Sequence, residues 1–124
     1  MAAHHEDLKV WQKAHKLSLE IYRLTGSFPR EETYGLIAQI RRAAAAVATN
    51  IAEGAARQSR REFAQFVSIA RGSASEVCDL LLLSKNLGYG DATKYAKVLD
   101  DYDHISRMLT KLLRSLREEQ KLRD

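Results

Sequence analysis

Ten lysine and arginine side chains fall into three groups along the sequence, and each group could bind phosphate. They are Lys9, Lys13, Lys16, Arg23, Arg57, Arg60, Arg61, Arg107, Lys111 and Arg114. Cations of this kind bind the phosphates of RNA or DNA without reading the bases. No base-reading motif accompanies them, so they predict nucleic-acid binding with little sequence preference. A solvated helix face gives the same pattern for the first four.

The same charges are also compatible with a protein-interaction scaffold that binds no nucleic acid. The net charge is only +4, from 20 Lys and Arg against 16 Asp and Glu, which permits a polyanionic partner without requiring one. Acids interrupt the basic surface at Glu6, Asp7, Asp100, Asp101 and Asp103. Two function classes therefore stay open, and salt-dependent retention on RNA or DNA would distinguish them.

Catalytic and metal-binding patterns are missing from the sequence. Di-metal sites in helical bundles use Glu-x-x-His pairs, and the nearest approach here is Asp101-Tyr-Asp-His104. Cys78 has no evident histidine to activate it and is expected to be a small apolar filler. The chain is therefore predicted to be a non-enzyme with no catalytic residue, no cofactor and no metal.

A further set of polar residues is predicted to be structural. Arg41, Arg42, Asn50, Glu53 and Glu76 are expected to form ion pairs and hydrogen bonds within a packed bundle. One expected pair joins Glu53 to Arg57, four residues apart on one helix. Trp11 and Tyr22 could stack on a base, but their helical spacing favours packing.

These residues must be positioned by helices, because apolar residues recur at helical spacing along the whole chain. Helices are predicted over about 8–25, 31–56, 59–86 and 91–117, with a frayed tail at 118–124. Pro29 and two acids mark the second start, Ser59 and Glu62 form a capping box for the third, and Asp91 caps the fourth. Short connections predict a single all-α domain, an antiparallel up-and-down four-helix bundle.

Some apolar residues point away from the core of this bundle. Ala45 and Ala48 lie on the far side of the second helix, and Leu82 and Leu83 fall outside the apolar face of the third. Such residues require cover that one small bundle cannot supply. They predict a closed homo-oligomer with these four residues at the interface.

Composition also bears on location. The single cysteine excludes an intramolecular disulfide and favours a reducing compartment. The sequence shows no signal core and no apolar run long enough for a bilayer. A cytoplasmic protein with no membrane partner is expected.

Several short motifs, in order and spacing, are similar to those of one known family. They are Asp7 to Ala14, Tyr34-Gly35-Leu36, Gln39 to Ala43, Asn50 to Gly54, Ser59 to Phe63, Ile69 to Ser73, Glu76 and Leu87-Gly88-Tyr89. The chain resembles the four-helix-bundle proteins encoded by intervening sequences in bacterial 23S rRNA genes. The accessory variability protein of diversity-generating retroelements is a relative. The resemblance implies a homopentamer that engages RNA or DNA, together with a reverse transcriptase where a retroelement encodes the protein.

Overall fold

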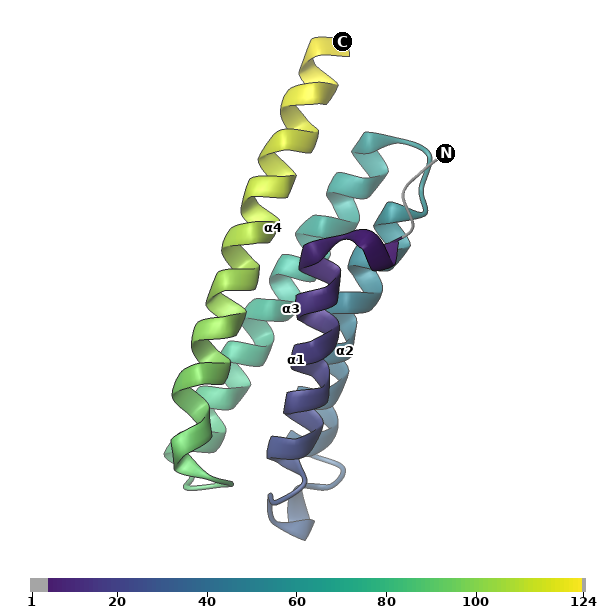
Figure 1. The fold of residues 1–124 in the computed structure, drawn as a ribbon. Coiled ribbons are helices and arrows are strands. Elements are labelled where there is room, and N and C mark those ends of the chain that lie inside the picture. The colour runs from purple at the N-terminus through teal and green to yellow at the C-terminus, as the bar shows by residue number, and fades with distance from the viewer. Residues whose placement is uncertain (1–4, 124) are drawn as a thin grey trace.

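The computed structural model describes residues 5–123 as four long α-helices in an up-and-down arrangement (Figure 1). The helices are α1 (Lys9–Thr25), α2 (Leu36–Ala55), α3 (Arg60–Asn86) and α4 (Tyr95–Arg123), and short 3-10 helices lie at His5–Asp7, Arg30–Glu32 and Ala92–Lys94. No strand occurs within the described range. The predicted all-α four-helix bundle is confirmed, and α4 extends beyond the other helices at the end where α2 connects to α3 (Figure 1).

The predicted apolar stripes form the core. Val10, Ala14, Leu17, Ile21 and Leu24 of α1 are buried, as are Leu36, Ile40, Ala43, Val47 and Ile51 of α2. The sequence predicts an apolar face of α3 made of Phe63, Phe66, Ala70, Ser73, Val77, Leu80, Leu81 and Ser84. The buried face is rotated from this one. It is centred on Ala64, Val67, Ala74 and Leu81, while Phe63 and Leu80 are only partly buried and pack at its edge. Alanines at the centre of this face let the neighbouring helices approach closely, and Phe63 and Leu80 cover its edges.

The start of α2 differs from the prediction, because the helix begins at Leu36 instead of residue 31. Gly35 has φ −106° and ψ −112°, outside the helical region, and so separates the 3-10 turn from α2. Glu32 Oε1 accepts a hydrogen bond from the Leu36 N–H at 3.2 Å. Its other oxygen accepts from the Tyr89 hydroxyl at 3.0 Å. Glu32 therefore links two chain connections at this end of the bundle instead of forming the first helical turn.

The N-terminus of α3 carries half of the predicted capping box. Ser59 Oγ accepts from the Glu62 N–H at 3.1 Å, while the Glu62 carboxylate lies 3.7 Å from Arg57 Nη1. Before α4, Asp91 Oδ1 accepts from the Thr93 N–H at 3.0 Å and caps a 3-10 turn. Hydrogen bonds from Thr93 lower the pKa of Asp91. Ser59 thus caps α3 as predicted, whereas Asp91 caps the 3-10 turn that precedes α4 and not α4 itself.

The predicted frayed tail at 118–124 is helical as far as Arg123. Leu116 is buried, with 7% of its surface exposed, so the apolar stripe of α4 reaches the end of the bundle core. One turn later Glu119 forms an ion pair with Arg60 at the start of α3. This contact joins residues far apart in the sequence and holds the last turns of α4 beside α3.

Candidate nucleic-acid interface

An open groove runs between the first half of α3 and the last turns of α4, and we name it the α3–α4 groove. It consists of two adjoining hollows that share Arg117 and Lys121. Its lining residues are Arg61, Ala64, Gln65, Ser68, Ile69 and Arg71 from α3, and Thr110, Leu113, Arg114, Leu116, Arg117, Glu118 and Lys121 from α4. Spacings of three and four residues place each set along one side of its helix.

The α3–α4 groove is strongly cationic. Arg61, Arg71, Arg114, Arg117 and Lys121 line it together with one acid, Glu118. None of these five cations forms an ion pair within the described part of the chain. Arg71 Nη1 donates across the groove to Thr110 Oγ1 at 3.3 Å. The other four are exposed, so their charges are available to an anionic ligand.

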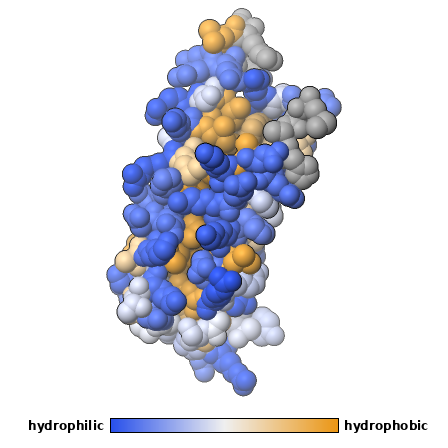
Figure 2. All heavy atoms as spheres, viewed as in Figure 1, coloured by the Kyte–Doolittle hydropathy of each residue, from blue (hydrophilic) through white to orange (hydrophobic). Residues whose placement is uncertain are grey.

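A second groove lies between α1 and α4, and we name it the α1–α4 groove. It is lined by Lys9, Gln12, Lys13, Lys16, Leu17, Glu20, Lys97, Val98 and Asp101. Figure 2 shows a strip of hydrophobic surface between α4 and α1 with hydrophilic side chains on both sides.

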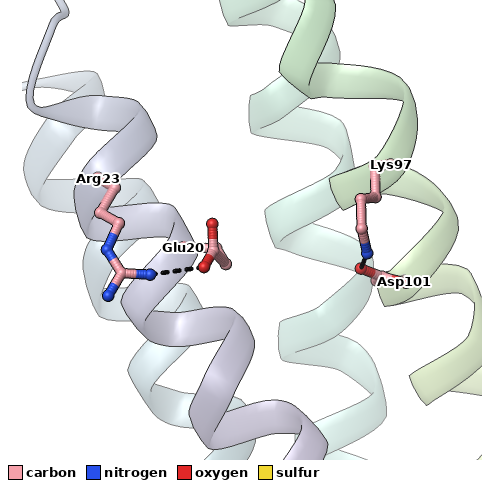
Figure 3. A network of polar contacts seen from close by, with 4 residues as sticks. All are labelled: Glu20, Arg23, Lys97 and Asp101. Atoms are coloured by element: carbon pink, nitrogen blue, oxygen red, sulfur yellow. Dashed lines mark hydrogen bonds and ion pairs between the residues drawn. The ribbon is translucent and has the colours of Figure 1, made fainter.

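Both acids of the α1–α4 groove are already paired (Figure 3). Arg23 Nη1 lies 2.6 Å from Glu20 Oε1 on α1, and Lys97 Nζ lies 2.9 Å from Asp101 Oδ2 on α4. The hydrogen bond to Asp101 raises the pKa of Lys97. Lys9, Lys13 and Lys16 make no ion pair with a described residue. This groove is therefore basic but partly compensated.

Most of the remaining predicted phosphate-binding cations have intramolecular partners. Arg57 Nη2 lies 2.9 Å from Glu53, and its guanidinium lies 4.9 Å from the centre of the Phe66 ring. Arg60 pairs with Glu119, and Arg107 pairs with Asp103. Lys111 is exposed and lines neither groove. Of the expected cluster at 57–61, only Arg61 is therefore unpaired.

The predicted structural polar residues divide into two groups. Arg41 Nε donates to Thr25 Oγ1 at 2.9 Å, and its guanidinium lies 4.4 Å from the centre of the Tyr22 ring. Asn50 Nδ2 donates to the Ala46 carbonyl at 2.7 Å, and the Glu53–Arg57 pair is present. Arg42 and Glu76, in contrast, are exposed and form no hydrogen bond or ion pair with any described residue. A structural role within one chain is therefore supported for Arg41, Asn50 and Glu53 only.

The residues considered for chemistry occupy ordinary packing positions. Trp11 stacks on His15, with ring centroids 4.8 Å apart, which fits the packing interpretation. Cys78 is half-buried, and burial followed by the charge of Asp103 raises the pKa of its thiol. Over residues 5–123, no three His, Cys, Asp or Glu side chains gather in a way that could hold a metal ion. The grooves are thus the most distinctive surface features.

Three cations of the α3–α4 groove were missing from the predicted set, namely Arg71, Arg117 and Lys121. Arg117 and Lys121 continue the spacing of Arg114 by three and four residues, so extending the last helix would have revealed them. Arg71 joins the groove only because α4 packs beside α3. No local pattern indicated that.

Residues 6–111 match the family model of the 23S rRNA-intervening sequence protein family. The chain belongs to this family. Its fold is also similar to that of a protein of unknown function from the S23 ribosomal protein family of Bacteroides thetaiotaomicron. That comparison gives a TM-score of 0.75 at 23% identity and covers 84% of this chain and 97% of the other. No curated protein matches the sequence.

Family membership confirms the resemblance found in the sequence, while the link to diversity-generating retroelements stays a prediction. The cations that α4 contributes to the α3–α4 groove, Arg114, Arg117 and Lys121, lie beyond the matched range. Among the described residues, no helix combines the length and apolar character that a membrane span requires.

Proposed function

We propose that this family member is a non-enzymatic accessory protein that binds RNA or DNA through phosphate contacts, with little sequence preference. The observation that carries the proposal is the α3–α4 groove, where five cations face one carboxylate and no ion pair within the described chain neutralises them. Exposed cations bind phosphates by charge and by displacing condensed counterions.

The shape of the groove supports phosphate contacts over base reading. Its walls are two packed α-helices, and its cations point to phosphates without any base-reading motif beside them. Phosphate contacts fix position but carry no sequence information. Binding is therefore expected to vary little with sequence.

The test is fluorescence anisotropy with the full chain and labelled mixed-sequence RNA and DNA, titrated at several salt concentrations. If all five groove cations each neutralise one phosphate, log affinity should fall against log salt with a slope of about −4.5 for duplex DNA. If neither nucleic acid binds at low salt, the proposal fails and the interaction-scaffold interpretation is favoured.

Exposed apolar residues favour a second proposal, that the protein forms a closed homo-oligomer. Leu82 and Leu83 are 47% and 48% exposed on α3, although both are large and apolar. Ala45 is half-buried, whereas Ala48 is only 6% exposed because its own chain covers it, so Ala48 is removed from the proposed interface. A pentamer is proposed only on the family resemblance.

Light scattering tests the assembly. Leu82→Asp should reduce the mass of the particle, because it places a charge in an apolar contact. Leu122→Asp is a matched control on a side chain that is 89% exposed. A monomeric mass for the unmodified protein at micromolar concentration would refute the oligomer, whereas another subunit number would correct only the count.

A further inference from the structure

The α3–α4 groove contains no aromatic side chain among its described lining residues. Its apolar surface comes from Ala64, Ile69, Leu113 and Leu116, which are small or aliphatic. Proteins that bind single strands without sequence preference usually stack the bases on aromatic rings. A single strand in this groove would bind by its phosphates alone.

The aromatic side chains of α1 that could serve as a platform already have partners. Trp11 stacks on His15, and the Arg41 guanidinium lies over the Tyr22 ring. Trp11 and Tyr22 belong to α1, whereas the walls of the groove are α3 and α4. Their stacking surfaces would have to be uncovered before a base could use them.

The cations are carried by a rigid backbone, because they project from two helices packed together. Arg61 and Arg71 are separated by about 15 Å along α3, since each residue of an α-helix advances about 1.5 Å. Arg114 and Lys121 are separated by about 10 Å along α4 by the same measure. Leu113 and Leu116 are buried at the base of the α4 row and fix it against the core. The spacing of the two rows is therefore set before a ligand arrives.

Two rows of cations at a fixed separation favour a ligand whose phosphates are already in fixed positions. A duplex already holds its phosphates in order, with one charge per about 1.7 Å of its axis. A single strand must lose conformational freedom when it binds, and stacking is not available here to offset that loss.

We infer that the α3–α4 groove selects double-stranded nucleic acid over single strands. This inference rests on the proposed function and names the ligand class for the same site. The shared chemistry is the phosphate backbone of a duplex. DNA and RNA duplexes are therefore separate arms of the test.

The experiment compares three labelled probes of one mixed sequence: a DNA duplex, an RNA duplex and the unpaired DNA strand. With five phosphates neutralised, salt slopes of about −4.5 for duplex DNA and about −3.5 for the strand are expected. The duplex should bind about tenfold more tightly at a salt concentration of about 0.15 M. Equal or tighter binding of the single strand would overturn the inference while leaving the proposed function intact. Failure of all three probes would refute the proposed function itself.

Two variants with equal charge loss locate the preference. Arg61→Gln, Arg117→Gln and Lys121→Gln together should reduce the preference for duplex over strand from about tenfold to about twofold, because only two groove cations remain. Lys9→Gln, Lys13→Gln and Lys16→Gln together should retain it. Circular dichroism checks that both variants keep their helical content. If the groove variant binds duplex as tightly as the unmodified protein, the assignment to this groove is wrong.

Discussion

Two grooves flank α4, and they differ less in the number of cations than in the placement of acids. The α1–α4 groove has Glu20 and Asp101, each paired with a cation three or four residues away. The α3–α4 groove has only Glu118, which forms no ion pair with a described residue. An acid that forms an ion pair with a cation one turn away neutralises it locally. Counting basic residues therefore says less about binding than counting those that form no ion pair.

The grooves also differ in their relation to the family. Every residue lining the α1–α4 groove lies within residues 6–111, the range that the family model matches. The α3–α4 groove takes Arg114, Arg117 and Lys121 from the part of α4 after that range. Three of the five unpaired groove cations thus come from the part of α4 after the matched range, whereas Arg61 and Arg71 lie within it.

The largest effect is expected from removing charge in the α3–α4 groove. Arg61→Gln, Arg117→Gln and Lys121→Gln together should flatten the salt slope by about 2.7 for duplex DNA, because three phosphate contacts are lost. At about 0.15 M salt this corresponds to about a hundredfold weaker binding. Anisotropy titrations with duplex DNA at several salt concentrations measure both quantities.

The matched variant in the α1–α4 groove sharpens this comparison. Lys9→Gln, Lys13→Gln and Lys16→Gln together remove the same charge but should weaken binding less than about fivefold, since charges more than a Debye length from the ligand are screened. Equal losses in the two variants would show that net charge, and not the α3–α4 groove, determines binding.

A smaller effect is expected from giving the α3–α4 groove a second acid, placed one turn from Arg61. Gln65→Glu places a carboxylate four residues after Arg61, which reproduces the arrangement of the α1–α4 groove. Losing one phosphate contact should weaken duplex binding about fivefold at about 0.15 M salt. Gln39→Glu makes the same chemical change at an exposed site on α2 and is the control. No difference between the two variants would argue against Arg61 as a contact.

The sequence predicted the fold well because each helix has its own apolar stripe, and because Ser59 and Asp91 mark the starts of two helical segments. It failed where a contact between distant residues decides the structure. Glu32 is held by Leu36 and Tyr89, and the end of α4 is held through Arg60 and Glu119. The contacts of Glu32 accompany the later start of α2. The Arg60–Glu119 ion pair accompanies the helical tail.

The candidate site was predicted only in part, for a related reason. The sequence groups cations by position along the chain, whereas the α3–α4 groove combines Arg61 and Arg71 with residues of another helix. Some intramolecular pairs could have been read locally, because Glu20 with Arg23 and Asp103 with Arg107 lie within one turn. Recognising these two pairs would have removed Arg23 and Arg107 from the predicted set.

The smallest effect is expected from removing the acids of the α1–α4 groove. Glu20→Gln with Asp101→Asn releases Arg23 and Lys97, so that this groove becomes as uncompensated as the other. Duplex affinity should rise only about twofold, because the released charges lie away from the bound backbone and act through screened, long-range attraction. The helical spectrum should stay unchanged, since exposed ion pairs contribute little to stability. A gain of tenfold or more would mean that the α1–α4 groove is itself a binding site that its acids suppress. Placement of acids, and not the choice of helix pair, would then be the only difference between the two grooves.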